Sequence, residues 1–293
     1  MKQRPFGTPG LMVSRLGLGA GQIGDAALDE STVATLLNTA LDLGVTLIDT
    51  ARSYGLSEAR IGKHLAHRRS EFVLSTKVGY GIPGRPDWTF DTIAAGIDAA
   101  LTLMRTDVID IAHLHSCPLA TLHDGAVIKA LTRARDQGKI RVAAYSGENA
   151  ELEWAIRSGR FGSVECSVNV FDQQSLNDRL PLAAANGVGV IAKRPLGNAP
   201  WRFAQRPHGD YAEVYWGRMQ ALGYDLAGLP WDELALRFAT HAPTVGSAIV
   251  GTASVAHLRH NVALADKGPL PADVFGAITA RYRELGTHWP GEI

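Results

Sequence analysis

The sequence predicts an α/β fold: a (β/α)8 TIM barrel with an N-terminal β-hairpin and a C-terminal helix, forming one domain over residues 1–293. Eight short apolar segments alternate with segments of helical periodicity. Most apolar segments begin roughly 25 to 37 residues after the previous one, as βαβ units require. Polar residues also gather where these segments end, which is typical of a barrel with one functional rim.

The predicted strands are apolar along nearly their whole length, as expected for parallel strands covered on both faces. They lie near residues 15–21, 46–51, 72–78, 108–115, 141–147, 163–169, 189–195 and 247–252. Eight strands of this kind, each followed by a helical segment, favour a closed barrel over an open sheet.

The helices and connections are predicted from periodicity and turn residues. Ser31 is the expected N-cap of the first helix, and Val33, Leu36 and Leu37 begin its apolar face. The opening "KQRPFGTPGLMVS" predicts a hairpin with its turn at "GTPG". The widest gap, between the seventh and eighth strands, contains "GNAPWRFAQRPHGDY" and predicts a long loop. Further helices are expected from about Ser254 and Ala272.

Composition excludes several classes of function. Lys plus Arg and Asp plus Glu each total 29, so no net charge favours nucleic acid as a partner. The N-terminus lacks the apolar run of a signal peptide, and no segment is long and apolar enough for a membrane span, so a cytoplasmic protein is expected. The two cysteines, Cys117 and Cys166, are expected to be small buried side chains, and no metal site is predicted.

An acid, a lysine and a histidine end three consecutive predicted strands: Asp49, Lys77 and His115. In this barrel the carboxyl ends of all strands meet at one rim, where active sites form. Neighbouring strands lie about 4.8 Å apart, so these side chains can touch. Other polar residues at strand ends are Ser146, Asn169, Lys193, Arg194 and Thr252.

Tyr54 follows Asp49 on the connection to the next helix. A free phenol has a pKa of about 10, and the ammonium of Lys77 is expected to lower it. Asp49 would hold that lysine charged, and His115 could donate a hydrogen bond to the same substrate oxygen. This arrangement suits proton donation to a carbonyl oxygen, while hydride must come from a cofactor.

One motif imitates a different fold. "GAGQIG", from Gly19 to Gly24, fits the G-x-G-x-x-G pattern of a Rossmann domain and precedes Asp49. A Rossmann helix would open at the last glycine, but "DAALDES" intervenes here. We therefore interpret these glycines as sites of turns and close backbone packing at the barrel mouth.

With these motifs in order, the chain resembles the aldo-keto reductase family along almost its whole length. The resemblance is carried by "DTARSYGLSEARIGKHL", "STKVG", "IDIAHLHSCP", "GKIRVAAYSG" and "IVGTASVAHLRHN". It implies a barrel that binds a nicotinamide cofactor without a Rossmann domain. It also implies Tyr54 as proton donor, Asp49 and Lys77 as its tuning pair, and His115 as the residue that orients the carbonyl.

The resemblance further implies how the cofactor is held. Ser146 and Asn169 match residues near the nicotinamide, although Glu165 stands where a Gln is usual, and Lys193 replaces an aromatic residue that often stacks on the ring. His257 stands where many members place an Arg for the 2′-phosphate. NADPH is the first expectation. NADH is the alternative, because an Arg suits the 2′-phosphate better than His does. The full set implied for cofactor binding is Gly21, Asp49, Ser146, Asn169, Lys193, Arg194, Leu196, Gly251, Thr252, Ser254, His257 and Asn261.

The substrate pocket is expected on the loops after the strands, with walls from Tyr80, Trp88, Cys117 and Trp201. The C-terminal tail beyond Trp289 is short, which predicts an open pocket. The expected substrate is a small carbonyl compound or a sugar. Two alternatives remain at this point: an aldose or lactol dehydrogenase running in the oxidative direction, and a cofactor-binding redox-sensing regulatory subunit. The sequence gives no oligomeric state.

Overall fold

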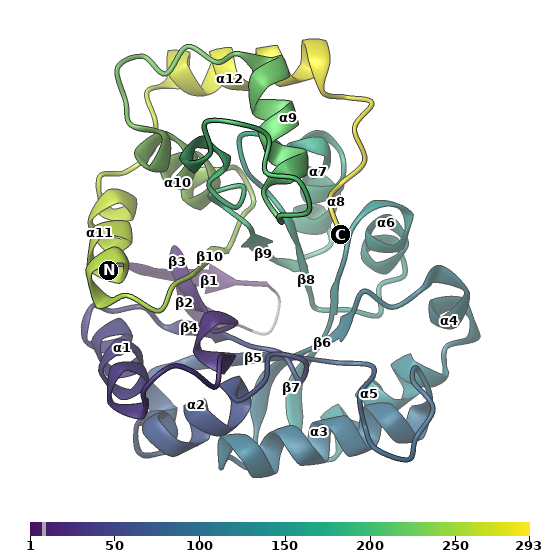
Figure 1. Cartoon of the computed structure of the whole chain (residues 1–293). Helices are drawn as coiled ribbons and strands as arrows, with labels where there is room; N and C mark the ends of the chain where they lie inside the picture. Colours follow the sequence, from purple (N-terminus) through teal and green to yellow (C-terminus); the bar gives the residue numbers. More distant parts are fainter. Residues whose placement is uncertain (8–9) are drawn as a thin grey trace.

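A closed barrel of eight parallel strands forms the centre of the molecule, as predicted (Figure 1). The structure, a computed structural model, describes residues 1–7 and 10–293. The strands follow one another around the barrel in chain order, and the last pairs with the first. They are β3 (Leu16–Gly19), β4 (Leu47–Asp49), β5 (Val73–Val78), β6 (Ile109–His115), β7 (Ile140–Ser146), β8 (Ser163–Ser167), β9 (Gly189–Lys193) and β10 (Ser247–Gly251).

Helices surround the strands as an outer layer, and α9, α10 and α12 gather on one side, at the top of Figure 1. The main apolar core lies between strands and helices, where side chains such as Leu36, Ile97 and Leu131 are fully buried. The helices are α1 (Glu30–Asp42), α2 (Ser57–Leu65), α3 (Phe90–Met104), α4 (Leu119–Asp124), α5 (Ala126–Asp136), α6 (Asn149–Arg157), α7 (Gln174–Asn177), α8 (Arg179–Ala185), α9 (Glu213–Leu222), α10 (Trp231–His241), α11 (Val255–Asp266) and α12 (Ala272–Leu285). The short 3-10 helices are η1 (Gln22–Gly24), η2 (Ala66–Glu71) and η3 (Pro200–Arg202).

The predicted hairpin closes the N-terminal end of the barrel. Its strands are β1 (Gln3–Phe6) and β2 (Leu11–Ser14), paired with Phe6 opposite Leu11. The predicted turn at "GTPG" includes residues 8 and 9, which lie outside the described residues. Phe6 packs in one apolar cluster with the barrel-interior residues Leu47 and Ile111. A Cβ at Gly246 would lie 2.4 Å from the Phe6 ring, so this glycine gives the ring its space.

One sequence prediction was incomplete and another is wrong. Between the seventh and eighth strands, the expected loop is present and contains η3, but two helices that were not predicted, α9 and α10, follow it before β10. The N-cap of α1 is Asp29 rather than Ser31: the Asp29 carboxylate accepts a hydrogen bond from the Thr32 N–H at 3.1 Å. Ser31 lies inside the first turn and donates to Asp29. A carboxylate at this end also interacts favourably with the helix dipole.

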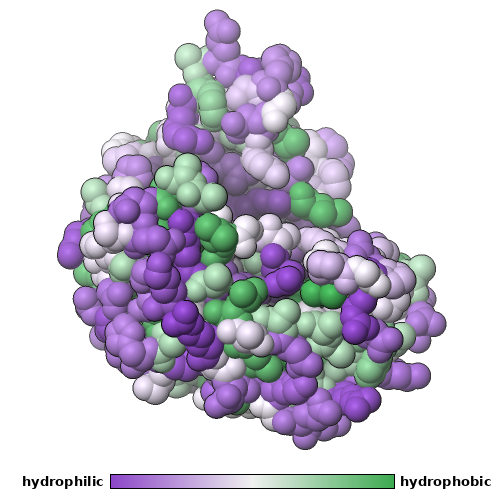
Figure 2. Space-filling view, turned by 60° about the horizontal axis from the view of Figure 1, so that its bottom comes forward, coloured by the Kyte–Doolittle hydropathy of each residue, from purple (hydrophilic) through white to green (hydrophobic). Residues whose placement is uncertain are grey.

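The last two helices begin where the sequence predicted, with Ser254 as the N-cap of α11 and Ala272 as the first residue of α12. Among the described residues, no helix is both long and apolar enough to cross a bilayer. The face in Figure 2 is mainly hydrophilic, with scattered hydrophobic side chains around a recess.

Replacing Phe6 by Ala should lower the free energy of unfolding by about 3–5 kcal/mol, because the ring is 2% exposed and closes the barrel floor. The measurement is chemical denaturation followed by circular dichroism. Met12→Ala is the matched control, since Met12 lies on the same hairpin but is 44% exposed. Equal losses for the two variants would contradict a packing role for the hairpin.

Candidate active site

Tyr54 is positioned by close backbone packing between its loop and η1. A Cβ at Gly24 would lie 1.9 Å from the Tyr54 carbonyl oxygen, so no larger residue fits there. The next residue, Gly55, has a φ of +52°, and the Leu56 N–H donates to the Gly24 carbonyl at 3.0 Å. This glycine of "GAGQIG" therefore serves close packing at the barrel mouth, as interpreted from the sequence, and the closed barrel excludes the Rossmann fold.

Lys77 lies at the centre of a buried charge cluster. It is 1% exposed and donates hydrogen bonds to the Asp49 carboxylate and, at 3.1 Å, to the Thr50 carbonyl. Its Nζ also lies 3.3 Å from Oε2 of Glu165. The ion pair expected between Asp49 and Lys77 is therefore present, and a second buried carboxylate joins it.

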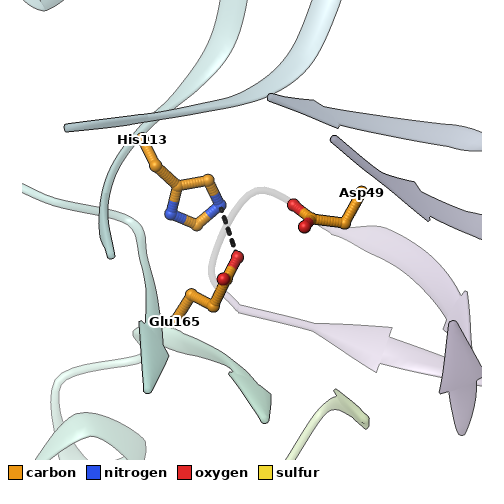
Figure 3. Close-up of side chains that lie close together, drawn as sticks. All are labelled: Asp49, His113 and Glu165. Carbon is orange, nitrogen blue, oxygen red and sulfur yellow. Dashed lines mark ion pairs between the residues drawn. The ribbon is translucent and has the colours of Figure 1, made fainter. Parts of the chain in front are cut away.

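Figure 3 shows Glu165 facing His113 across the barrel interior, with Asp49 nearby. Glu165 lies 4.0 Å from His113 Nε2, and a ligand atom from each of these three residues lies within 4.8 Å of the others. Three such groups could in principle bind a metal ion. However, the Lys77 ammonium already contacts both carboxylates, so it occupies the position that a metal ion would take between them.

The cluster shifts the pKa of each member. Burial tends to raise the pKa of Glu165, but the charge of Lys77, joined at low pH by that of protonated His113, outweighs it and lowers the value to about 2. Burial and the charge of Glu165 raise the pKa of Asp49 to about 7. Burial tends to lower the pKa of Lys77, but the two carboxylates raise it overall. Burial lowers the pKa of His113 to about 4, so this imidazole is neutral at neutral pH.

The pKa of Tyr54 is raised, so the sequence expectation of a lowered value is wrong. Its ring centroid lies 5.4 Å from the Lys77 Nζ, and the lysine charge does act to lower the pKa. Burial and the charges of Asp49 and Glu165 act in the opposite direction, and they win. Tyr54 consequently keeps its proton at neutral pH.

His115 lies beside Tyr54, with ring centroids 6.0 Å apart in an edge-to-face arrangement. Burial and the charge of Lys77 lower the pKa of His115 to about 3, so the ring is neutral. The Tyr80 hydroxyl lies 2.8 Å from His115 Nδ1. If that hydroxyl donates, Nε2 carries the ring proton and is free to donate to a substrate. Tyr80, expected as a pocket wall, thus contacts a candidate catalytic residue.

A cavity of about 680 Å³ opens beside Tyr54 and continues to the N-terminal end of α11. Nine of the residues expected to hold the cofactor line it: Gly21, Asp49, Lys193, Arg194, Leu196, Gly251, Thr252, His257 and Asn261. Ser146, Asn169 and Ser254 do not line it. Ser146 donates to Glu165 at 3.3 Å, and Ser254 caps α11. Asn169 is fully buried, and its side-chain N–H group has no hydrogen-bond partner among the described residues.

Of the four expected pocket walls, Trp201 lines this cavity and stacks on Trp231 with ring centroids 5.7 Å apart. Cys117 is fully buried in the main apolar core, as is Cys166, which fits the expectation that both cysteines are small buried side chains. Trp88 packs against Gly79, where a Cβ would lie 2.3 Å from the Trp88 ring.

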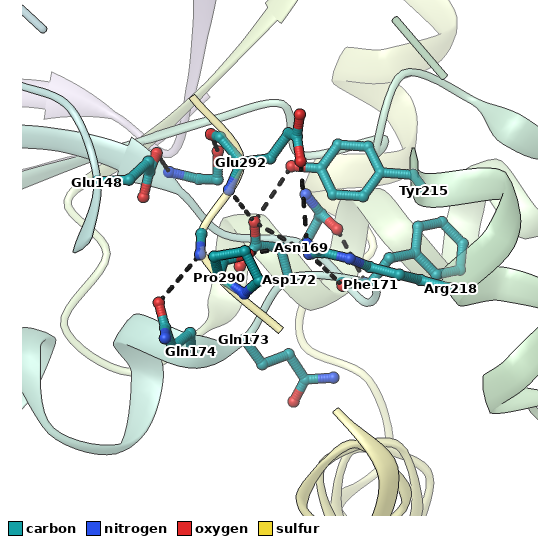
Figure 4. Close-up of polar contacts among 12 residues, drawn as sticks. Glu148, Asn169, Phe171, Asp172, Gln173, Gln174, Tyr215, Arg218, Pro290 and Glu292 are labelled. Atoms are coloured by element: carbon teal, nitrogen blue, oxygen red, sulfur yellow. Dashed lines mark hydrogen bonds and ion pairs between the residues drawn. The ribbon is translucent and has the colours of Figure 1, made fainter. Parts of the chain in front are cut away.

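The C-terminal tail is held by hydrogen bonds to residues that follow β7, β8 and β9 in the chain (Figure 4). The Glu292 N–H donates to the Asp172 carboxylate at 3.0 Å, and the Gly291 N–H donates to Asn149 at 2.8 Å. Arg194 donates to the Glu292 carbonyl, so one of the cavity residues also holds the tail. The tail therefore lies beside the cavity, but none of its residues is among those that line it, so the open pocket expected from its length stays a prediction.

Replacing Lys77 by Met should destabilise the protein by about 3–5 kcal/mol at pH 8, because two buried carboxylates lose their counter-charge. Their folded-state pKa values would rise above about 4, the unfolded value, so stability would be present at low pH and lost as pH rises. Denaturation at pH 5 and pH 8 should show a larger loss at pH 8. The exposed Lys63→Met is the control, and an equal loss at both pH values would contradict the charge cluster.

Comparison with known proteins agrees with this geometry. The model of the aldo/keto reductase family matches residues 15–283. The chain is 26% identical to the uncharacterized oxidoreductase YqkF of Bacillus subtilis, covering 97% of each chain, and 28% identical to L-galactose dehydrogenase of Arabidopsis thaliana, covering 89% and 86%. The holo structure of aldo-keto reductase AKR11C1 from Bacillus halodurans superposes with a TM-score of 0.83 at 27% identity, over 96% of each chain. The chain therefore belongs to the aldo/keto reductase family of oxidoreductases, which use nicotinamide cofactors and act on small-molecule carbonyl substrates.

Proposed function

We propose that this protein reduces aldehyde or ketone carbonyls to alcohols, with Tyr54 as proton donor and a nicotinamide cofactor as hydride source. The observation that carries the proposal is the placement of a protonated Tyr54 over the buried Lys77, with a neutral His115 at its edge. A phenol and an imidazole N–H can both donate to one carbonyl oxygen, which polarises the carbonyl.

Tyr54, His115 and Lys77 have different roles in the proposed reaction, according to the charge and proton that each carries. As the substrate oxygen gains negative charge, the Tyr54 hydroxyl transfers its proton to it and the His115 Nε2–H stabilises the same atom by hydrogen bonding. Lys77 stabilises the phenolate that Tyr54 becomes, since its ammonium is fixed and dehydrated. The cofactor, when bound, supplies the hydride.

NADPH is the proposed cofactor, with NADH as the alternative. The residues lining the cavity include His257 and Asn261 on α11, and Arg202 on η3. His257 lies in the first turn of α11 and can hydrogen-bond to a phosphate at that helix N-terminus, where anions are favoured. Asp232 also lines the cavity, where it lies 2.7 Å from His260, and its negative charge would oppose a phosphate, which is the reason for keeping NADH as the alternative.

The oxidative direction uses the same residues, and the relative L-galactose dehydrogenase makes a sugar substrate a real alternative. Oxidation needs Tyr54 as phenolate, and its raised pKa makes that form scarce at neutral pH. Oxidation is therefore expected to be slow at neutral pH and to become faster as the pH rises. A purely regulatory role is disfavoured because the side chains suited to proton transfer, Asp49, Tyr54, Lys77 and His115, lie together.

Replacing Tyr54 by Phe should lower the turnover of a simple aromatic aldehyde by about 100- to 10,000-fold, since the proton donor is lost. Initial rates would be measured with NADPH and NADH in parallel, and cofactor affinity by fluorescence titration should be unchanged. Tyr211→Phe is the control, because Tyr211 lines the same cavity but is 88% exposed. Undiminished turnover in Tyr54→Phe would refute the role of Tyr54, and a wild type inactive on aldehydes would next be tested for oxidation of aldoses.

The two directions should differ in their dependence on pH. Reduction needs the protonated phenol, so its rate should stay level until the pH passes the raised pKa of Tyr54, above its ordinary value of about 10. Oxidation needs the phenolate and should rise with pH over the same range. Saturating initial rates from pH 8 to pH 10, where Asp49 with its pKa of about 7 is ionised, would measure both. A reductive rate that falls between pH 8 and pH 9 would contradict the raised pKa.

A further inference from the structure

Glu165 is a buried carboxylate that the proposed proton transfer does not use. It is 1% exposed, and its Oε1 accepts a hydrogen bond from Ser146 at 3.3 Å. Its Oε2 lies 3.3 Å from the Lys77 Nζ but has no partner in hydrogen-bond geometry among the described residues. Burying an ionised group without full hydrogen bonding is destabilising, so we looked for a function of this charge that explains its presence in the site.

The charges around Glu165 do not balance. Lys77 is one ammonium, and it faces the two carboxylates Asp49 and Glu165. His113 and His115 are neutral because burial lowers the pKa of each. Two other cations near the site are paired with carboxylates: Lys193 with Glu148 at 3.2 Å, and Arg218 with Asp172 at 3.5 Å. Arg194, which lines the cavity, donates to the Ser167 hydroxyl at 3.2 Å and to the Glu292 carbonyl. Once Asp49 is ionised, the cluster of Lys77, Asp49 and Glu165 itself carries one net negative charge.

A nicotinamide ring that serves the proposed reaction must lie close to this charge. Its hydride-donating carbon has to approach within about 3.5 Å of a carbonyl carbon whose oxygen is held by Tyr54 and His115. The Lys77 Nζ lies 5.4 Å from the Tyr54 ring centroid and 3.3 Å from Glu165. Over separations of this order inside a protein, charge–charge interactions are weakly screened.

We propose that Glu165 makes the site bind the oxidised nicotinamide, a cation, more tightly than the neutral reduced one. The inference rests on the proposed function, because it places the reacting ring beside Tyr54. Glu165 acts through its charge rather than by touching substrate, so it is a residue that tunes the bound cofactor. Tighter binding of the oxidised form makes the bound cofactor a stronger hydride donor.

The test is the ratio of two dissociation constants, for the reduced and the oxidised cofactor, measured by quenching of tryptophan fluorescence at pH 8.5. At this pH Asp49, whose pKa is about 7, is ionised. The wild type should bind NADP+ more tightly than NADPH. Glu165→Gln keeps the shape of the side chain and removes its charge, so the preference should fall by about tenfold, mainly through weaker NADP+ binding. Glu165→Asp, which keeps the charge, should retain the preference.

Glu58→Gln is the matched control. Glu58 is also a buried carboxylate, bonded to Thr76 at 2.8 Å, but Thr76 alternates with Ser75 and Lys77 and so faces away from the barrel interior. This variant should keep the wild-type ratio. Any of three results would overturn the inference alone. The first is an equal ratio in wild type and Glu165→Gln, and the second is the same fall in the ratio in Glu58→Gln. The third is tighter binding of NADPH than of NADP+ by the wild type. If the wild type binds only NAD+ and NADH, the same ratio is measured with that pair, and the same outcomes decide. A wild type that binds neither NADP(H) nor NAD(H) would overturn the proposed function together with the inference.

Discussion

The rest of the site depends on the burial of one ammonium, that of Lys77. A lysine that is 1% exposed is stable as a cation only if opposite charges lie against it, and Asp49 and Glu165 provide them. The same contacts stabilise the ionised carboxylates in the barrel interior, where two anions would otherwise repel each other. The (β/α)8 barrel makes this possible because strands distant in sequence end at one rim, so β4, β5 and β8 each bring one member of the cluster.

Tyr54 is held over this cluster by backbone packing and a small hydroxyl network. Gly24 lets η1 approach the Tyr54 carbonyl, and Ser57 donates to the Ala20 carbonyl at 2.8 Å while accepting from Thr50 at 2.7 Å. The loop is therefore tied to β3 and β4 on both sides. Such fixed positioning contributes to catalysis because the reacting groups need no further ordering when substrate binds.

The sequence predicted the barrel, its hairpin and the meeting of Asp49, Lys77 and His115, because strand order and strand ends alone determine these. It did not predict the contact between Lys77 and Glu165, which depends on distances across the barrel between strands that are not neighbours. The sign of the Tyr54 pKa shift failed for the same reason, since it is a balance of opposing charges, one of which is Glu165. Likewise, the anchoring of the tail to Arg194 depends on a distant part of the chain that no local pattern reveals.

The extra carboxylate has two opposite effects on the proposed reaction. Its charge favours a cationic oxidised ring, but it also raises the pKa of Tyr54 and so disfavours the phenolate formed in the same event. For the chemical step the two effects partly cancel, because a positive and a negative charge appear together. The two effects no longer cancel once the Tyr54 phenolate has taken a proton from solvent, because only the oxidised nicotinamide then keeps its charge. A rate constant is therefore a poor measure of what Glu165 does, whereas the affinity for each oxidation state contains the first effect without the second.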